Sequence, residues 1–587
     1  MKKTRLFATA LALCLLLSLA AGCGQGAAGS APAPAPTSTG TAAGDADAAT
    51  TLTFGSTSQL QTEPVPWLET VFMQDIQARA NVQIDYTYYD EDKFNLLLAS
   101  RDLPDFVLCT YGGKLDDVIA GGLALDLDPL LEQHAPNMLQ DIYTQRNGMV
   151  RALKGGDEQA LYFIADSIGV EYARGNKDNA RGYNLRWDYY LELGAPEITD
   201  DNTYLDILSQ MLAAHPETAD GKPVYASGVY DSLSAWFDRG AFTQPSLLNV
   251  WTFMGSQYMS GWDDNELYNG YTDTSRSAFW LDMGFYNKMH GMGMLDPDSF
   301  TQTYDEMLVK IRGGQYLAGM GWNYQELYLT TAAEDPATLA GFAQIASANA
   351  LAFTDYFVPT GTFPSYFTFI SKDSPNAEAV LGFYNVLHDF DVQRMFFSGV
   401  EGTHWDTVDG VPTMRDEWVQ MFADADPRLL AEGMVETNFT RMLMGTIDHP
   451  DGYPLNLMDT DEMRAATLNP LQQSVADHFG VQYPGQATYQ LSQQGRAVDM
   501  SNAKGEQIAL GLEAMPNDIA RIVEKCNDIV YRAIPSLVMA GSQAEFDAVQ
   551  RQVFSDLEAA GEATAWDWCL QTYTRARDLI EPILAQR

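Results

Sequence analysis

The hydrophobic positions of the chain alternate between short strands and helices. The segments 52–54 and 82–86 have the composition and period of strands, and 106–108 is an uninterrupted apolar strand. Between them, 71–80 and 93–100 space their hydrophobic residues as helices do. Strand, helix, strand, helix, strand is the opening of an α/β layer, so we expect a parallel sheet covered by helices.

The rest of the chain divides into a second α/β stretch and a helical end. The second stretch begins near Gly182, and the chain after residue 420 is mainly helical, as in 519–530 and 546–557. No internal repeat is visible. At 587 residues the chain is too long for one hydrophobic core, so we expect two or three domains.

The N-terminus has the pattern of an export signal. Residues 1–22 begin with Lys2 and Lys3 and continue with an apolar stretch that ends in small residues. Cleavage before Cys23 within the sequence LAAGC resembles a bacterial lipobox, although Ala20 stands where leucine is usual. The resemblance implies a lipidated Cys23, and the alternative is an ordinary cleaved signal with an incidental cysteine.

The segment that follows Cys23 has the composition of a flexible tether. Residues 24–50 contain only Gly, Ala, Ser, Thr, Pro, Gln and Asp, which cannot offset the entropy lost on ordering. Beyond the signal, no segment approaches the ~20 uninterrupted apolar residues of a membrane span. We therefore expect attachment to the outer face of the cell membrane through the N-terminal lipid only, as in a Gram-positive bacterium.

The charge excludes one class of partner. The chain has 35 Lys and Arg against 78 Asp and Glu, a formal net charge of −43. Such a chain repels phosphate backbones and anionic lipid faces, so we expect no nucleic-acid partner. A solvated acidic surface explains the charge, whereas a cation-collecting surface would need a specific cluster.

Several segments resemble, in order, the extracellular solute-binding proteins of carbohydrate-type ABC importers. The segment 93–108 (KFNLLLASRDLPDFVL) is similar to a signature of this family, except that Arg101 replaces a usual glycine, and 156–162 is longer than the family's strand. Further resemblances lie at 122–131 (GLALDLDPLL), 183–194 (YNLRWDYYLELG), 371–387 (SKDSPNAEAVLGFYNVL) and 399–410 (GVEGTHWDTVDG).

The resemblance implies an α/β, two-lobed periplasmic-binding-protein-like fold with hinge strands and a helical C-terminal region. Lobes of this kind close on a ligand while a few hinge residues absorb the backbone change. The implied domains are a signal peptide (1–22), a lipidated tether (23–50), lobe 1 (51–182, with its return at 358–400) and lobe 2 (183–357, completed by the helical 401–587).

No catalytic or metal motif stands out. The chain has no GxSxG, HExxH, GxxxxGK[ST] or GxGxxG motif, and its seven histidines are never paired at helical spacing. The acidic runs 263–266 and 459–462 lack the glycine and glutamate of a calcium loop, so solvated turns are the favoured interpretation. We expect Cys109 to be buried, and a Cys526–Cys569 disulfide stays open.

Aromatic residues in polar, loop-like settings are the remaining indication of a binding site. A sugar ring presents flat C–H faces flanked by hydroxyls, so its site needs an aromatic ring beside polar groups. Core packing is the competing explanation for each ring. Trp322 is the strongest candidate for a ligand-stacking ring, because Gly319 and Gly321 mark a loop after an apolar strand. Trp405 is the next candidate. The expected ligand contacts are Gln59, Tyr111, Trp236, Asp238, Trp322, Asn323, Tyr324, Tyr366, Glu401, His404 and Trp405.

The sequence therefore predicts a monomeric extracellular binding protein, without catalysis, cofactor or metal, that delivers a small solute to the permease subunits of an ABC importer. A neutral oligosaccharide is favoured, because Arg239 is the one basic residue in the candidate loops. The alternatives are a cell-surface glycoside-processing enzyme, a binding protein for a non-sugar solute such as a peptide or polyol, and a structural or adhesive lipoprotein.

Overall fold

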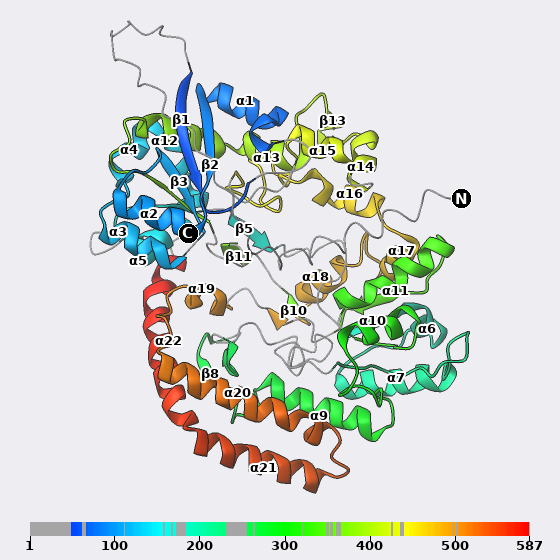
Figure 1. Ribbon diagram of the computed structural model, residues 1–587. Coiled ribbons are helices and arrows are strands. Elements are labelled where there is room, and N and C mark those ends of the chain that lie inside the picture. The colour runs from blue at the N-terminus through cyan, green and yellow to red at the C-terminus, as the bar shows by residue number, and fades with distance from the viewer. Residues whose placement is uncertain are drawn as a thin grey trace, which may run out of the picture. The chain divides into compact units, whose positions relative to one another are not determined.

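Figure 1 shows a computed structural model of the chain. The residues from Ala49 onward form one compact unit, and the predicted signal, Cys23 and most of the predicted tether lie outside the described residues. The structure describes residues 49–60, 66–110, 112–155, 159–165, 168–171, 183–230, 255–261, 264–319, 321–347, 351–352, 356–359, 366–423, 426–434, 440–496, 498–499 and 503–585.

The largest sheet has five strands in the order β2-β1-β3-β12-β4. Strand β1 is parallel to both β2 and β3, whereas β12 is antiparallel to β3 and β4. The parallel part follows the predicted alternation of strands and helices, because each pair of parallel strands needs a crossover helix between them. The bounds are β1 (Thr50–Ser56), α1 (Val71–Arg79), β2 (Val82–Tyr88), α2 (Glu91–Ser100), β3 (Phe106–Cys109), β4 (Ile164–Ala165) and β12 (Phe367–Ile370).

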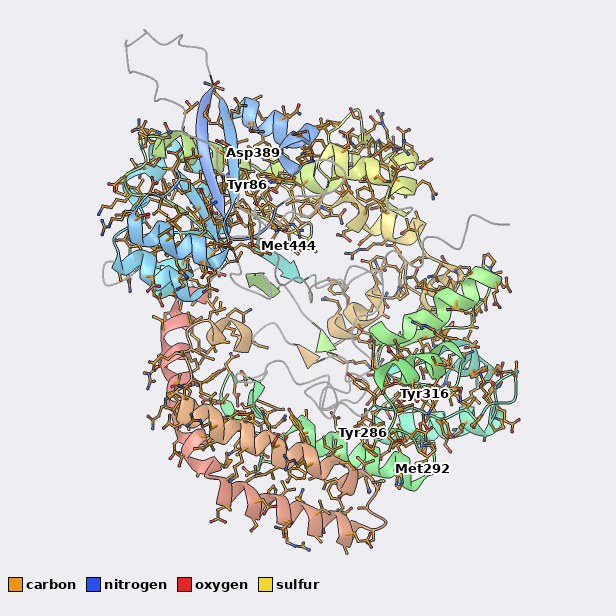
Figure 2. All side chains as sticks on the ribbon, in the orientation of Figure 1. Tyr86, Tyr286, Met292, Tyr316, Asp389 and Met444 are labelled. Atoms are coloured by element: carbon orange, nitrogen blue, oxygen red, sulfur yellow. The ribbon has the colours of Figure 1, made fainter. Side chains whose placement is uncertain are left out.

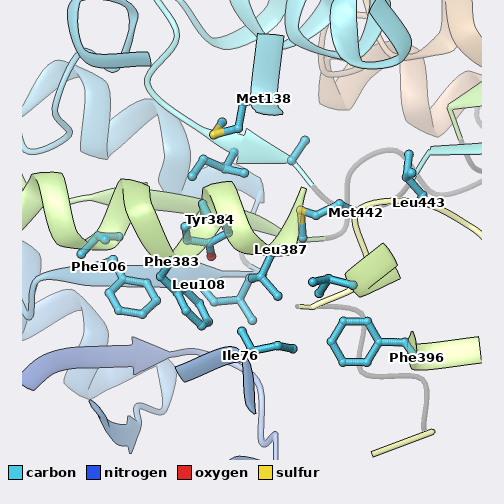
Figure 3. Packing of buried hydrophobic residues seen from close by; sticks show 14 of the residues in the cluster. Ile76, Phe106, Leu108, Met138, Phe383, Tyr384, Leu387, Phe396, Met442 and Leu443 are labelled. Atoms are coloured by element: carbon cyan, nitrogen blue, oxygen red, sulfur yellow. The ribbon is translucent and has the colours of Figure 1, made fainter. Parts of the chain in front are cut away.

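This sheet is the centre of one hydrophobic core, here called the first core. All four residues of β3 are buried, which is typical of a strand covered on both faces. In Figure 3, Phe106 and Leu108 lie beside Phe383 and Tyr384. The elements around the sheet are η1 (Trp67–Glu69), α3 (Gly112–Ala120), α4 (Asp128–His134), η2 (Pro136–Leu139), η3 (Asp141–Tyr143), α5 (Thr144–Lys154), α12 (Ala377–Leu387) and α13 (Phe390–Ser398).

The first core also contains the segment that follows α13. Its buried hydrophobic residues extend from Trp405 to Met463, and Figure 3 shows Met442 and Leu443 on the same cluster as Leu387. The resemblance implies that 401–587 completes lobe 2, whereas these side chains pack on the first core. The elements here are β13 (Trp405–Val408), β14 (Val411–Met414), α14 (Asp416–Ala423), α15 (Pro427–Glu432), η6 (Leu457–Asp459) and α16 (Asp461–Ala466).

A second core is built from two other parts of the chain, with buried residues from Tyr183 to Ile345 and from Leu471 to Ala576. A small cluster around Ile311 and Tyr316 accompanies it. The elements are β6 (Tyr183–Arg186), α6 (Trp187–Glu192), α7 (Asp201–Ala214), β7 (Tyr258–Ser260), β8 (Leu267–Asn269), α9 (Ala278–Gly291), α10 (Tyr304–Arg312), α11 (Gly321–Glu334), β9 (Phe342–Ile345), α17 (Pro470–Phe479), α18 (Gln486–Gln493), α19 (Gly505–Ala509), α20 (Asn517–Val538), α21 (Gln543–Ala560) and α22 (Glu562–Leu584).

Short strands lie on the chain segments that link the two cores. Strand β5 (Ile168–Glu171) follows the first part of the first core, and β11 (Tyr356–Pro359) lies on the return from the second core. The two strands pair antiparallel, with Val170 opposite Phe357. A parallel pair, β10 (Leu351–Ala352) with β15 (Val498–Asp499), brings the return segment beside a distant part of the chain.

The C-terminal helix α22 contacts both cores. Cys569 and Tyr573 are buried in the second core. Near the end of the helix, the Leu584 carbonyl accepts a 3.1 Å hydrogen bond from the side chain of Gln145 in α5. Ile583 lies so close to Gly148 of α5 that a Cβ at that glycine would be 3.1 Å from it. Within the described part of the chain, none of the helices has the length and apolar character of a membrane span.

Candidate functional site

The candidate site lies at the edge of the main sheet where β1 and β3 end and β12 begins. Ser56 pairs with Leu108 at the carboxyl end of the parallel strands, and Cys109 pairs with Phe367 at the start of β12. Thr110 and Tyr366 are the residues next to this last pair, Thr110 after β3 and Tyr366 before β12. Open α/β sheets bind ligands at the carboxyl ends of their strands. We call the residues Thr57, Gln59, Thr110 and Tyr366 the sheet-edge site.

Hydroxyl groups join the two strand ends of the sheet-edge site. The Oγ1 atoms of Thr57 and Thr110 lie 2.9 Å apart, and the Thr110 amide donates to Thr57 Oγ1 at 2.8 Å. The Thr57 amide donates to the Leu108 carbonyl at 3.0 Å, which extends the ladder by one residue. These bonds fix two hydroxyl groups at the edge of the sheet, and the residue Thr110 is only half-buried.

The loop that carries Gln59 is held by Tyr86 on β2, which is labelled in Figure 2. The Tyr86 hydroxyl donates to the Ser58 carbonyl and accepts from the Leu60 amide, both at 3.1 Å. Burial raises the pKa of Tyr86, so its hydroxyl stays protonated and keeps this donor role. Gln59 lies between the two bonded residues and is exposed.

A buried pair supports the same edge from within. The guanidinium of Arg146 on α5 donates at 3.1 Å to the carbonyl of Ala165, the last residue of β4. Its Nη2 lies 3.0 Å from Nε2 of His388, and Nδ1 of that ring lies 2.7 Å from the Tyr384 carbonyl. A carbonyl only accepts, so Nδ1 carries the hydrogen and Nε2 accepts from Arg146. Burial, with the guanidinium beside it, holds the pKa of His388 well below its usual value, so the ring is neutral.

Of the ligand contacts expected from the sequence, Gln59 and Tyr366 lie at one edge of the main sheet. The ligand contacts expected from the sequence did not include Thr57, Thr110 or Tyr86. The signal that could have found the two threonines is a hydroxyl residue immediately after a strand end, where the backbone ladder stops and side chains replace it.

A second group of proposed residues follows helix α13, and its two aromatic rings are buried. His404 is 1% exposed, and its ring centroid is 4.2 Å from that of Trp418. Trp405 is 9% exposed and donates from Nε1 to the Gly399 carbonyl. Glu401 is exposed and accepts from Thr407. The burial of the two rings favours packing over ligand contact.

The loop predicted around Trp322 is wrong. Residues Trp322, Asn323 and Tyr324 lie in the first turn of helix α11, and the described residues 313–319 before it form only an isolated bridge at Tyr316. The glycines that indicated a loop flank a helix start instead. The side chains of these three residues, and the residues Tyr111, Trp236 and Asp238, lie outside the described residues.

The acidic and cysteine positions have ordinary structural roles where the structure describes them. Asp264 pairs with Arg276, Asp459 pairs with Arg464, and Asp461 accepts from the Tyr483 hydroxyl. Among the described residues, no group of three or more His, Cys, Asp or Glu side chains could hold a metal ion. Cys109 is buried, as expected. Cys526 and Cys569 are buried free thiols, so no disulfide joins them, and burial raises the pKa of both to about 12.

Comparison with known proteins gives no match by sequence, either to a family model or to a curated protein. Solved structures do match. An HMO-binding, ABC-transporter-associated solute-binding protein from Bifidobacterium longum infantis is 15% identical, with a TM-score of 0.53, over 91% of this chain and 99% of its own. The chain has the solute-binding-protein fold.

Two further structures with this fold match over similar lengths. An extracellular solute-binding protein from Bifidobacterium longum subsp. infantis is 14% identical, and an ABC-transporter substrate-binding protein from Streptococcus pneumoniae, in complex with kestose, is 13% identical. Each has a TM-score of 0.50 and covers 90% of this chain and 99% of its own. All three are named as binding proteins. The solute-binding-protein fold accounts for the mixed α/β cores and the linking strands.

Proposed function

We propose that the protein is an extracellular substrate-binding lipoprotein that captures a neutral oligosaccharide between two lobes and delivers it to an ABC importer. The observation that carries this proposal is the shared fold, which extends over nine-tenths of the chain. The sheet-edge site supports it, because fixed hydroxyls, an amide and a tyrosine ring suit a polyhydroxylated ligand.

The lobes in this proposal follow the two cores. Lobe 1 consists of 51–182, 358–400 and the additional segment 401–463, whose buried residues lie in the first core. Lobe 2 consists of 183–357 and the chain from Leu471 onward. The paired strands β5 and β11 are then the hinge, since they lie on two of the linking segments.

The ligand class follows from charge and site chemistry. A formal net charge of −43 opposes the approach of an acidic sugar. The described members of the sheet-edge site are uncharged, so neutral hydroxyl groups fit them. A binding protein for a peptide or polyol is the alternative that the same residues allow, because fold alone does not fix the ligand.

We expect ligand binding to depend on the ring of Tyr366. Replacing Tyr366 by Ala removes a stacking face and should weaken binding about ten- to hundredfold, whereas Tyr366→Phe keeps the face and should stay close to the parent. A thermal-shift screen of residues 51–587 with maltotriose, raffinose, kestose and trigalacturonate identifies a ligand, since binding to the folded state raises its stability. Calorimetry then compares the variants.

Three results would contradict parts of this prediction. Parent affinity in Tyr366→Ala would remove the ring from the site. Preferred binding of trigalacturonate, or affinity that falls steeply with salt, would contradict a neutral ligand. Turnover of a bound oligosaccharide would favour the glycoside-processing enzyme instead.

We expect Cys23 to anchor the protein. This expectation rests on the small residues before Cys23 and on the segment 24–50 after it, which has no large apolar residue that could pack in a core. In a Gram-positive host, Cys23→Ala should move the protein from the membrane fraction to the medium, while Cys14→Ala, inside the predicted signal, should leave it on the membrane. Retention of the Cys23→Ala protein in the membrane fraction would contradict lipid attachment at this cysteine.

A further inference from the structure

The second core contains a cavity that is separate from the sheet-edge residues. Its volume is about 390 Å³, and its described lining residues come from 190–198, 345–346 and 478–496. These segments are the end of α6 and the loop after it, the end of β9, the end of α17, and α18 with the residues that follow it. Ligand pockets are generally about 300–1,000 Å³, so this one has the size for a single small unit.

Apolar and aromatic side chains form one part of the cavity wall. Ile198 and Ile345 are almost fully buried, at 1% and 2% exposure. The rings of Tyr190 and Phe479 also line the cavity. The hydroxyl of Tyr190 is already bonded to the Pro196 carbonyl, so this residue offers mainly its ring. This part of the wall suits the C–H face of a ring.

Two amide side chains face the same cavity from α18 and its extension. Gln490 and Gln494 are four residues apart, so they lie on one face of a helical turn. The backbone amide of Gln494 donates to the Gln490 carbonyl, which continues the helical geometry through both residues. Neither side-chain amide bonds to another group within the described chain. Each can therefore donate to and accept from a ligand hydroxyl.

The charges on the cavity wall cancel. Arg496 and Glu197 form an ion pair at 2.7 Å, and both side chains line the cavity. Among the described lining residues, His478 is the one other ionisable group besides the tyrosine. Burial lowers the pKa of His478, so its ring is neutral at neutral pH. The lining thus offers no net charge to a ligand, which disfavours a free carboxylate or an ammonium group.

We propose that this pocket binds one neutral sugar ring, stacked on its apolar wall and bonded through its hydroxyls to Gln490 and Gln494. The ring has two possible sources: a free monosaccharide, or the terminal residue of the captured oligosaccharide. The second source rests on the proposed function.

The double variant Gln490→Ala/Gln494→Ala tests the pocket. Both side chains are exposed, so the variant should fold with an unchanged melting temperature. Loss of two hydrogen-bonding amides should weaken sugar binding about tenfold. The matched control is Gln493→Ala, which removes an exposed amide of the same helix that does not line the cavity, and which should bind like the parent.

The probes are glucose, galactose, fructose and N-acetylglucosamine as free rings, the neutral trisaccharides maltotriose, raffinose and kestose, and leucine as a zwitterion. Saturation-transfer NMR detects binding, and calorimetry measures it. Weaker binding of a monosaccharide in the double variant assigns the pocket to a free ring. If only the binding of a trisaccharide becomes weaker, the pocket is assigned to the terminal residue of an oligosaccharide.

The remaining outcomes overturn the inference. Sugar affinity equal in the parent and the double variant overturns the pocket but leaves the proposed function intact. Leucine binding that weakens in the double variant overturns the sugar assignment. Absence of binding by every sugar in the parent overturns the proposed function and this pocket together.

Discussion

Gly399→Ala is expected to destabilise the protein by about 3–5 kcal/mol, through backbone strain combined with displacement of a buried ring. Gly399 ends α13 with φ 72° and ψ −156°, a conformation open to glycine and little else. A Cβ there would lie 2.2 Å from Cγ of His404. His404 is enclosed by Phe72 and Trp418, so it has little room to move.

The neighbouring Gly402 separates the two causes. It also has a positive φ, 80°, but no heavy atom lies within 4 Å of a Cβ at this position. Gly402→Ala should therefore show the conformational cost alone, on the order of 1 kcal/mol. Unfolding midpoints in guanidinium chloride measure both variants. Equal losses in the two would mean that the His404 contact contributes nothing.

Asp105→Ala is expected to cost about 3 kcal/mol, because it removes the acceptor of four hydrogen bonds at once. The carboxylate accepts from the amide and the hydroxyl of Thr53, each at 2.8 Å, and from Ser374 and Asn376 at 2.6 and 3.2 Å. It thereby joins β1, the start of β3 and the turn before α12. Truncation leaves these donors without their partner in a site that is 7% exposed.

The pH dependence of this loss has a definite sign. Burial opposes ionisation of Asp105, but the bonds from Ser374, Thr53 and Asn376 outweigh it and hold the pKa of the carboxyl below its ordinary 3.8. The stabilisation is then complete above the unfolded pKa and is lost as pH falls through the folded one. Urea unfolding from pH 7 to pH 3 should show the parent approaching Asp105→Ala at the acid end.

Asp102→Ala provides the matched control for Asp105. Asp102 is in the same turn, but it is exposed. Its removal should change stability by less than about 0.5 kcal/mol. A loss at Asp105 no larger than the loss at Asp102 would contradict the role given to the hydrogen bonds.

The local patterns of the chain predict the first sheet well. The strands expected at 52–54, 82–86 and 106–108 are β1, β2 and β3, and the helix expected at 93–100 is α2. These segments are short, close in sequence and strongly patterned, so each local preference agrees with the fold. The helices expected at 519–530 and 546–557 lie within α20 and α21 for the same reason.

The sheet-edge site was only partly predictable, because it depends on strand pairing. Tyr366 and Thr110 come to the same sheet edge through the pairing of β12 with β3, which no local pattern reveals. Trp405 shows the opposite difficulty. Its polar neighbours suggested a ligand loop, but β13 pairs with β14 and the indole packs into the first core. A tryptophan in a polar sequence can turn inward while its neighbours stay in solvent.

The interleaving of the two cores has a consequence for how the molecule is made. Strand β12 inserts between β3 and β4, so the five-stranded sheet stays incomplete until the chain up to Ile370 has been synthesised. The buried residues of the first core extend to Met463, so the last of them are synthesised after most of the buried residues of the second core. Contacts of such long sequence separation fold slowly. A cut between β1 and α22 therefore leaves at least one core without strands or helices that belong to it, and any uninterrupted piece of sequence that contains one whole core also contains part of the other.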